Sequence, residues 1–400
     1  MAVEQNGPVH INVPFDEPLY ETTNKLIVSP FKRTLNLTET EEDFILNDFT
    51  DIWNSASRKI ILIGAHYPDE LLQQQLNTLI NDESVLVFTE TTSNVHHPKF
   101  INSIDKLLFP IGDDDFEVLK PEVLVTLGGM VVSKRVKQFL RKYKPNHHWH
   151  VDQKNAPDTY HSLTKHFRIK PTTFFDKFNK KIKPIKSAYQ QNWLTIKAGR
   201  NNKHDEFVKD VKFSDFKVIG TILSKIPNNI LLQLGNSSVI RYVQLFENNH
   251  SIDVFCNRGT SGIDGSTSTA IGAATISKNQ TVFITGDISF FYDSNALWNN
   301  YMPNNFRIII MNNSGGGIFK ILPGPKKTNA LDYFETKHEL TAEHLCKMHQ
   351  LEYSKVVNEL ELSNALTCFF DDSDQPKLLE IFTPSNINDE VLKDYFKSIQ

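Results

Sequence analysis

The sequence predicts an α/β protein built from two doubly wound parallel-sheet domains. Apolar runs of strand length alternate along most of the chain with polar segments of helical periodicity, the order typical of a parallel sheet with helices on both faces. A basic, proline-containing stretch without periodicity, residues 177–187, interrupts this alternation and is interpreted as an interdomain linker. With 400 residues, 40% of them hydrophobic, the chain can bury more than one core.

Composition and charge exclude several classes of protein. A formal net charge of −4 argues against nucleic acid as an obligate partner. No apolar run approaches the roughly 20 residues of a membrane helix, and Met1 is not followed by a basic and apolar signal sequence. Three scattered cysteines, Cys256, Cys346 and Cys368, form neither a CxxC pair nor a disulfide framework. These features predict a cytoplasmic protein with no nucleic-acid or membrane partner.

The first of the two domains is expected over residues 37–183, with a predicted helix at 69–81. Four strands are expected in it, at 59–64, 84–90, 123–127 and 148–151. No G-x-G-x-x-G follows these strands, so the sequence does not predict a dinucleotide site. The histidine clusters of this region lack the i, i+4 spacing and the acidic partner of a zinc hydrolase site, and no metal is assigned to them.

Lys134 and Arg135 follow the third of these strands and the turn Gly128-Gly129, near the start of a predicted helix. This position lies at the edge of the sheet where ligands bind in doubly wound folds. Two interpretations stay open for the pair. It either binds an anionic ligand or belongs to a solvated basic face, because further lysines and arginines follow on the same helix.

The second domain is expected over residues 189–400. A predicted strand at 229–234 ends in Gly-Asn-Ser-Ser, and a helical segment at 239–247 follows. Free backbone N–H groups at a helix N-terminus attract anions, and Arg241 in the first turn can bind a carboxylate through two hydrogen bonds. Ser237 and Arg241 are therefore candidate anion-binding residues. Other elements are expected at 215–225, 341–350 and 388–398 as helices and at 377–382 as a strand.

A glycine-rich loop at 257–265 follows a short predicted strand at 254–256 and carries Arg258. Its glycines allow the backbone to approach a ligand closely, and Arg258 lies at the same strand-end edge. The spacing is not that of a dinucleotide fingerprint. Taken alone, the loop is a weak signal and also fits an ordinary helix start with an incidental arginine.

Residues 281–319 give the strongest indication of function. They are interpreted as a strand at 281–285, a helix at 294–301, a strand at 307–311 and a glycine loop, which together form a βαβ unit. Both strands open on the same edge of the sheet. Polar groups placed after the two strands can therefore converge on one point.

Asp287 follows the first strand of this unit and Asn313 follows the second. A carboxylate, an amide oxygen and a backbone carbonyl of the glycine loop suit a hard octahedral cation such as Mg²⁺, which completes its shell with phosphate oxygens and water. Each residue alone is better explained as a helix cap or a turn residue. The pair at this spacing favours the metal site.

The motifs GDIS…YDSNAL…NNSGGGIF…LP and NRG-SGIDG resemble those of the 2-succinyl-5-enolpyruvyl-6-hydroxy-3-cyclohexene-1-carboxylate (SEPHCHC) synthases, a menaquinone-pathway family of thiamine-diphosphate enzymes. Most thiamine-diphosphate enzymes have Gly-Asp-Gly where this chain has Gly286-Asp287-Ile288, and that departure is typical of this branch. The resemblance covers nearly all of the chain. It implies a central structural domain followed by a diphosphate-binding domain.

The resemblance also implies a reaction and its ligands. The family binds thiamine diphosphate with Mg²⁺ or Mn²⁺, decarboxylates 2-oxoglutarate and adds the resulting unit to isochorismate. The implied metal ligands are Asp287, Asn313 and Gly315. The implied cofactor contacts are Gly286, Asp287, Ile288, Ser289, Asn313, Gly315, Gly316, Ile263, Ile318 and Phe319. The implied substrate contacts are Arg241, Arg258, Lys134, Arg135 and Ser237.

Residues 7–15 are predicted to form a strand and resemble the end of the family's pyrimidine-binding domain, with a polar linker up to about residue 36. The glutamate that activates the cofactor in this superfamily belongs to that domain, so no catalytic residue is assigned in this chain. The chain alone is expected to turn over poorly, as a fragment or as one product of a split gene with a separate pyrimidine-domain partner. A homodimer or homotetramer is expected. Another 2-oxo acid lyase of the acetolactate-synthase kind and a non-catalytic cofactor-binding subunit are the alternatives.

Overall fold

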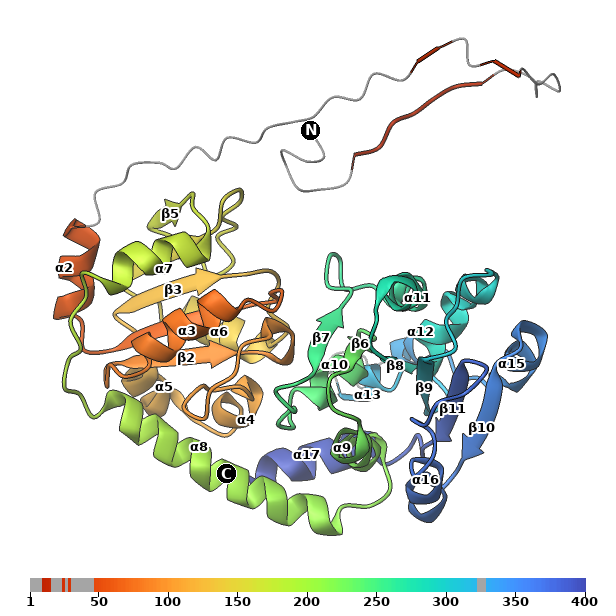
Figure 1. Cartoon of the computed structure of the whole chain (residues 1–400). Coiled ribbons are helices and arrows are strands. Elements are labelled where there is room, and N and C mark those ends of the chain that lie inside the picture. Colours follow the sequence, from red (N-terminus) through yellow and green to blue (C-terminus); the bar gives the residue numbers. More distant parts are fainter. Residues whose placement is uncertain (1–8, 16–23, 26–27, 30–46, 322–328) are drawn as a thin grey trace.

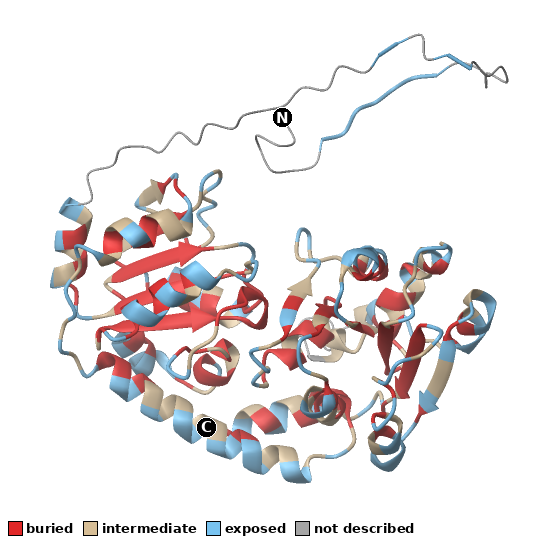
Figure 2. Cartoon of the chain, in the orientation of Figure 1, coloured by how far each residue is buried: buried red, intermediate tan, exposed pale blue. Residues whose placement is uncertain are grey.

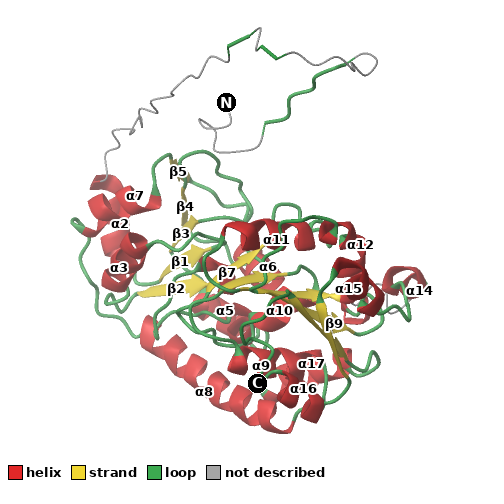
Figure 3. Ribbon diagram, turned by 45° about the vertical axis from the view of Figure 1, so that its right-hand side comes forward, coloured by secondary structure: helices red, strands yellow, loops and turns green. Residues whose placement is uncertain are grey.

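A computed structural model describes residues 9–15, 24–25, 28–29, 47–321 and 329–400, and it contains two α/β domains (Figure 1). Each domain is built on one sheet whose strands are all parallel. Helices cover both faces of the sheets (Figure 3). The predicted fold class is confirmed. No helix among these described residues is long and apolar enough to cross a membrane.

The first sheet has five strands in the order β2-β1-β3-β4-β5. Its strands are β1 (Lys59–Ile63), β2 (Val85–Thr89), β3 (Val123–Leu127), β4 (His147–Val151) and β5 (Lys165–Phe167). The helices of this domain are α2 (Asn47–Ser55), α3 (Glu70–Leu79), η1 (Thr91–Ser93), α4 (Ile104–Leu108), α5 (Asp113–Leu119), α6 (Lys134–Lys142) and α7 (Pro171–Asn179). Every residue of β1, β2 and β3 is buried (Figure 2), because helices cover both faces of the sheet.

The four predicted strands and the predicted helix of this domain are all present. Strand β5 was not predicted, since three residues with two polar side chains carry no recognisable periodicity. The predicted linker at 177–187 begins too early, because residues 177–179 form the last turn of α7. Phe178 explains this difference, as it is fully buried against Trp53 and Trp149 and keeps the helix on the sheet.

The second sheet has six strands in the order β10-β11-β9-β8-β6-β7. Its strands are β6 (Leu231–Leu234), β7 (Asp253–Cys256), β8 (Thr281–Gly286), β9 (Phe306–Asn312), β10 (Glu352–Val356) and β11 (Lys377–Phe382). The helices are α9 (Asp215–Lys225), α10 (Ser238–Val243), α11 (Ser266–Ile276), α12 (Asp287–Tyr292), η2 (Ser294–Leu297), α13 (Ile318–Ile321), α14 (Ala330–Glu335), α15 (Glu343–His349), α16 (Glu359–Ala365) and α17 (Asn388–Ser398). The register pairs Gly286 of β8 with Met311 of β9, so both strands end at the same level.

Most elements predicted for the second domain are present, but the helix predicted at 294–301 is wrong. The helix begins directly at the strand end as α12, and only a 3₁₀ turn, η2, follows it. Leu297 is buried, whereas Trp298 and Tyr301 are 87% and 77% exposed, so the apolar pattern of this segment is not a core-facing stripe. Strand β10, which is largely polar, was not predicted.

The strand predicted at 7–15 is also wrong over residues 9–15, the part that the structure describes. These residues pair with no described strand, and Ile11 and Phe15 are 76% and 86% exposed. Apolar alternation without a sheet edge to pair with does not make a strand. Residues 7 and 8 and most of the predicted linker up to residue 36 lie outside the described residues.

Helix α8 (Tyr189–Asp210) runs along both domains (Figure 1). Near its start, Tyr189 and Trp193 are buried in the core of the first domain. Near its end, Phe207 packs against the core of the second domain, and His204 is hydrogen-bonded to the Tyr395 hydroxyl of α17 at 2.8 Å. A single 22-residue helix therefore belongs to both hydrophobic cores and fixes one domain relative to the other.

Asn94, just after β2 and η1, connects the first domain to the sheet of the second. Its side-chain amide donates to the carbonyl oxygen of Val254 at 3.0 Å and accepts from the Val254 N–H at 2.8 Å. These two hydrogen bonds satisfy the N–H and the carbonyl of Val254 at the edge of β7, as a neighbouring strand would. Asn94 has φ = +51°, a conformation that asparagine tolerates better than most residues.

Several buried histidines make the fold sensitive to acid. Burial lowers the pKa of His148 to about 4 and that of His204 to about 3. Their pKa in the unfolded chain is about 6.5. The unfolded chain therefore takes up these protons first, so the free energy of unfolding is highest above pH 6.5 and falls as the pH drops from about 6.5 toward 4.

Urea unfolding between pH 8 and pH 4.5 measures this dependence. We expect His204→Gln, which cannot titrate, to lose less stability than the parent chain over the same interval. An equal loss of stability in the variant and the parent would show that His204 does not contribute to the acid sensitivity.

Candidate active site

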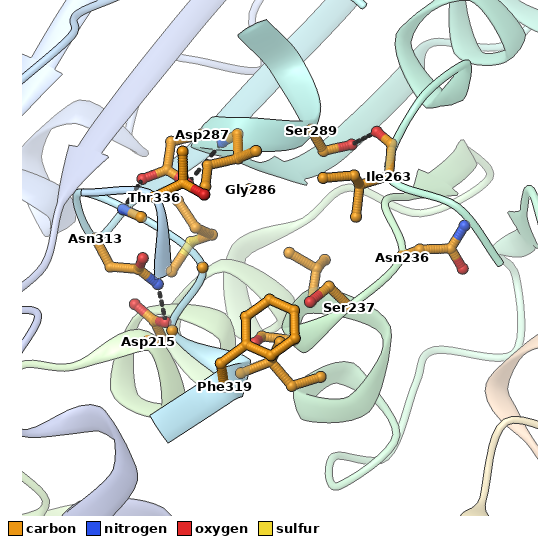
Figure 4. Close-up of a pocket in the computed structure, with 18 of the residues that line it drawn as sticks. Asp215, Asn236, Ser237, Ile263, Gly286, Asp287, Ser289, Asn313, Phe319 and Thr336 are labelled. Atoms are coloured by element: carbon orange, nitrogen blue, oxygen red, sulfur yellow. Dashed lines mark hydrogen bonds between the residues drawn. The ribbon is translucent and has the colours of Figure 1, made fainter. Parts of the chain in front are cut away.

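A cavity of about 410 Å³ lies at the carboxyl ends of β6, β8 and β9 in the second domain (Figure 4). It contains eleven of the fifteen residues predicted to contact cofactor or substrate: Ser237, Ile263, Gly286, Asp287, Ile288, Ser289, Asn313, Gly315, Gly316, Ile318 and Phe319. It is also lined by Asp215, Asn236, Tyr292, Met311, Tyr333, Phe334 and Thr336, which were not predicted. The predicted convergence of the strand ends is present in the structure.

Asp287 is the acidic residue at the end of β8, and it is 3% exposed. One of its carboxylate oxygens accepts the N–H of Ile288 at 2.7 Å, and the other accepts the N–H of Gly315 at 3.0 Å. The second oxygen also lies 3.2 Å from Nε2 of His338, and this close contact raises the pKa of His338. Asp287 thus ties the end of β8 to the glycine loop that follows β9.

The two asparagines that end β9 have different roles. Asn312 turns away from the cavity, and its amide N–H donates to the Glu380 carboxylate at 2.7 Å. Asn313 turns toward the cavity and donates from Nδ2 to Oδ2 of Asp215 at 2.8 Å. Its Oδ1 is buried and makes no hydrogen bond with the described residues. Of the pair, only Asn313 offers an oxygen to a ligand.

The glycine loop after Asn313 has a backbone that requires glycine at one position. Gly315 has φ = +150°, and a Cβ atom there would lie 2.6 Å from the carbonyl oxygen of Glu335. The N–H of Gly316 donates to the same carbonyl at 2.6 Å, and the N–H of Gly317 donates to the Gly315 carbonyl at 3.0 Å. The loop is therefore packed directly against the end of α14.

Apolar side chains from the loop after β7 and from α13 also line the cavity. Ile263 comes from the loop after β7, and its carbonyl accepts the Ser289 hydroxyl at 2.5 Å. Phe319 of α13 stacks on Phe334 of α14 with ring centroids 5.2 Å apart. The cavity is thus lined both by polar groups, among them Asp287 and Asn313, and by large apolar side chains.

Asn236, directly after β6, organises the loop that carries Arg258. Its Nδ2 donates to the carbonyls of Asn257 at 2.6 Å and Gly262 at 2.8 Å, and its Oδ1 accepts Nη1 of Arg258 at 2.8 Å. Nε of Arg258 is buried and has no partner among the described residues. Next to Asn236, Ser237 has φ = +70° and ψ = −123°, a strained backbone of the kind that clusters at functional sites.

The structure does not bring the four predicted basic residues into the cavity lining. Arg258 lies one hydrogen bond away from it, through Asn236. Arg241 is half-buried, and burial lowers its pKa while the Asp105 carboxylate opposes that shift. Arg135 lies over the rings of Phe109 and Phe116, and Lys134 is exposed. The local geometry of Arg135 thus fits a packing role, while Arg241 and Arg258 lie at the junction of the domains.

Glu90 is a buried carboxyl at this junction that the sequence did not single out. Its two oxygens accept the N–H groups of Val132 and Ser133, both at 2.7 Å, and so hold the start of α6. Burial raises its pKa to about 7, while these hydrogen bonds and the charge of Arg258 act in the opposite direction. Glu90 therefore connects the ligand edge of the first domain to the arginine of the second.

The described residues fit a divalent cation with a diphosphate. Asp287 supplies a carboxylate, Asn313 an orphaned amide oxygen and Gly315 a carbonyl, all oxygen donors of the kind that Mg²⁺ prefers. Gly317 adds space, because a Cβ there would meet the Asn313 amide at 3.3 Å. Bound here, thiamine diphosphate supplies the chemistry of 2-oxo acid decarboxylation.

Comparison with known proteins identifies the family. Residues 36–234 match the family described as "Middle domain of thiamine pyrophosphate", and residues 233–381 match "Thiamine pyrophosphate enzyme, C-terminal TPP binding domain". A protein of Flavobacterium psychrophilum named 2-succinyl-5-enolpyruvyl-6-hydroxy-3-cyclohexene-1-carboxylate synthase is 52% identical over all of this chain and 72% of its own length. The chain belongs to the SEPHCHC synthase family.

Other members of the SEPHCHC synthase family support the same assignment. A protein of that name from Flavobacterium johnsoniae is 51% identical over the whole of this chain and 72% of its own length. One from Porphyromonas gingivalis is 36% identical over 99% of this chain and 70% of its own length. The second domain is therefore a thiamine-diphosphate-binding domain, as the motifs at 257–265 and 281–319 predicted.

Two of the lining residues that were not predicted, Asn236 and Asp215, were missed for different reasons. Asn236 stands in the Gly-Asn-Ser motif that was recognised, and its position directly after a strand was a usable signal. Asp215 carries no motif, since it lies in the first turn of α9 behind the N-cap Ser214 and resembles any helix-starting acid. Its contact with Asn313, 98 positions further along the chain, appears only in the fold.

Proposed function

We propose that this chain holds the thiamine-diphosphate and metal site of a SEPHCHC synthase, acting in menaquinone biosynthesis on 2-oxoglutarate and isochorismate. The printed name of the relatives and the match to a thiamine-diphosphate-binding domain support this function. Under this proposal, residues 37–183 form the structural domain and residues 189–400 the cofactor domain. A homodimer or homotetramer, a separate pyrimidine-domain chain and a cytoplasmic location stay predictions.

One observation carries the proposal. Asp287, Asn313 and the glycine loop come from the ends of neighbouring parallel strands and line one cavity, which large apolar side chains also line. The proposed role of Asp287, Asn313 and the glycine loop is to hold the metal and the diphosphate. The proposed role of Ile263, Ile318 and Phe319 is to exclude water and to orient the apolar parts of cofactor and substrate.

The proposed substrates both carry two carboxylates, so their recognition requires fixed cations. Arg241 and Arg258 supply cationic groups beside the cavity in a chain whose net charge is −4. Asn236 holds Arg258 from one side and leaves its buried Nε without a partner. We assign to Arg258 the binding of a substrate carboxylate through charge-assisted hydrogen bonds.

The test of the proposed function is calorimetric titration of the chain with thiamine diphosphate in the presence and absence of Mg²⁺. Metal-dependent binding is expected, and its absence would overturn the proposal. Consumption of 2-oxoglutarate with isochorismate is then compared with consumption of pyruvate, and a preference for pyruvate would favour a lyase of the acetolactate-synthase kind.

Slow turnover is expected from the chain alone. Among the described residues that line the cavity, the acidic ones are Asp215 and Asp287, and hydrogen bonds already occupy both carboxylates. Neither is free to exchange a proton with the cofactor. Turnover at the rate of a complete family member would show that a group outside this set performs that step.

Arg258→Ala is expected to raise the KM for 2-oxoglutarate or isochorismate by about 10- to 100-fold, the range for losing a hydrogen bond to a charged group. The cofactor affinity is expected to change little, because Arg258 does not line the cavity. Lys278→Ala removes an exposed cation from the same domain and serves as the matched control. Equal KM values for Arg258→Ala and Lys278→Ala would remove Arg258 from the substrate site.

A further inference from the structure

The buried carboxylate of Asp215 lies next to Asn313, one of the proposed metal ligands. Asp215 is 3% exposed and begins α9, whereas Asn313 follows β9, so the contact joins two segments that are distant in the chain. Asn313 donates from Nδ2 to Oδ2 of Asp215 at 2.8 Å (Figure 4). A carboxylate accepts hydrogen bonds and cannot donate them when ionised, so the amide edge that faces Asp215 must be the N–H edge.

This contact determines where the amide oxygen of Asn313 points. Because Nδ2 is fixed on Asp215, Oδ1 faces the other way, and it is buried without a partner among the described residues. Gly317 leaves room for the amide on another side, since a Cβ there would lie 3.3 Å from Nδ2. A buried amide oxygen without a partner is costly unless a ligand satisfies it. A cation bound beside Asp287 would do so.

Asp215 is itself held by the C-terminal part of the chain. Its Oδ1 accepts the hydroxyl of Thr383, directly after β11, at 2.5 Å. Its backbone N–H donates to Oδ1 of Asn388 at the start of α17 at 2.9 Å. Thr383 thus holds the carboxylate of Asp215 in place, and the carboxylate in turn holds the amide of Asn313. Asp215 is therefore hydrogen-bonded both to the start of α17, through its backbone N–H, and to Asn313, through its carboxylate.

We propose that Asp215 is a positioning residue for the metal, which orients and polarises the amide of Asn313 so that Oδ1 coordinates the cation. This inference rests on the proposed function. Partners of this kind orient metal ligands and strengthen them as donors, and their loss typically weakens metal binding by about 10- to 100-fold. Asp215 does not touch the metal in this arrangement; it acts through Asn313.

The test compares two substitutions at position 215 in the whole chain. Asp215→Ala removes the acceptor and is expected to raise the Mg²⁺ concentration for half-maximal thiamine-diphosphate binding by about 10- to 100-fold. Asp215→Asn keeps an oxygen toward Asn313 and an N–H toward Thr383, so it is expected to stay within a few-fold of the parent chain. Calorimetry with Mg²⁺, and the electron paramagnetic resonance spectrum of bound Mn²⁺, report on the site without any need for turnover.

A purely structural role for Asp215 predicts a different result. In that case, Asp215→Ala would lower the unfolding temperature of the metal-free chain and leave the Mg²⁺ requirement for thiamine-diphosphate binding unchanged. That outcome would overturn the proposal. Thr383→Val is the matched control, because it removes a partner of Asp215 without touching Asn313. We expect its effect on the Mg²⁺ requirement to be smaller than that of Asp215→Ala.

Should Asp215→Ala fail to fold, an exchange of the two residues decides the question. Asn313→Asp alone would place two carboxylates against each other in a buried site and is expected to lose metal-dependent binding. Combining it with Asp215→Asn restores one donor and one acceptor, and a partial recovery of Mn²⁺ binding is expected. No recovery would count against the direct coupling.

The failure of the proposed function and the failure of this inference give different results. If the parent chain itself shows no metal-dependent binding, the proposed function fails and this inference fails with it. If the parent chain binds and Asp215→Ala has an unchanged Mg²⁺ requirement, only the inference is refuted.

Discussion

Replacing Asp287 by asparagine is expected to raise the Mg²⁺ concentration needed for thiamine-diphosphate binding by more than about 100-fold, beyond the range for a residue that acts through another ligand. Asp287 is the carboxylate ligand proposed for the metal, and both of its oxygens are already oriented by backbone N–H groups. Asparagine keeps the shape of the side chain and removes the negative charge. The binding of a hard divalent cation depends on that charge.

The fold is expected to tolerate this change. An asparagine oxygen can still accept the N–H of Ile288 or of Gly315, so the unfolding temperature of the metal-free chain should fall only slightly. Asp374→Asn, an exposed substitution in the same domain, is the matched control and should leave cofactor binding unchanged. Calorimetric titration with thiamine diphosphate at several Mg²⁺ concentrations measures the effect. An unchanged Mg²⁺ requirement for Asp287→Asn would remove this residue from the metal site.

Asp287 and Asn313 could be found from the sequence because of a general property of parallel sheets. Buried strands appear as short apolar runs, and the carboxyl ends of such strands meet at one edge. A polar residue that follows an apolar run is therefore placed in space by the strand before it. The same reasoning located the glycine loop that follows β9, whereas the family resemblance implied Gly315 as the individual ligand.

The pattern of strands in the sequence could not predict the positions of residues that a helix or the other domain holds in place. Asp215 reaches the cavity from the first turn of α9, and only the packing of α9 on the sheet brings it to Asn313. Lys134 and Arg135 show the opposite case. They follow a strand end, but that strand belongs to the first sheet, and Arg135 packs on the rings of Phe109 and Phe116. The periodicity of the sequence predicts where a residue lies within its own sheet. It does not predict how the two sheets are placed relative to each other.

The junction of the domains illustrates the same limit. Asn94 completes the edge of β7 with its side chain, and Glu90 holds the start of α6, yet neither residue belongs to a recognisable pattern. The contacts of Glu90 join segments of the first domain that lie 42 and 43 positions apart in the chain. The contacts of Asn94 depend on the relative placement of the domains, which α8 and its two hydrophobic cores fix. The cationic groups near the cavity, Arg241 and Arg258, lie in this region and inherit their positions from it.

Gly315→Ala is the second substitution with a large expected effect. The backbone at Gly315 has φ = +150°, which side chains rarely adopt, and the new Cβ would lie 2.6 Å from the carbonyl oxygen of Glu335. Strain of this kind costs on the order of 1–3 kcal/mol, so either the loop or α14 must move. Movement of the loop withdraws the Gly315 N–H from Asp287 and the Gly315 carbonyl from the proposed metal position. We expect cofactor affinity to fall by about 10- to 100-fold.

Gly272→Ala is the matched control for this substitution. Gly272 lies in α11, where a Cβ would meet nothing within 4 Å. Alanine is the better helix former by roughly 0.5–1 kcal/mol, so this variant should be slightly more stable than the parent and should bind the cofactor equally well. Thermal unfolding and calorimetric titration of both variants measure the contrast. If Gly315→Ala binds thiamine diphosphate as tightly as Gly272→Ala does, the tight contact between the glycine loop and α14 is not what holds the cofactor site in shape.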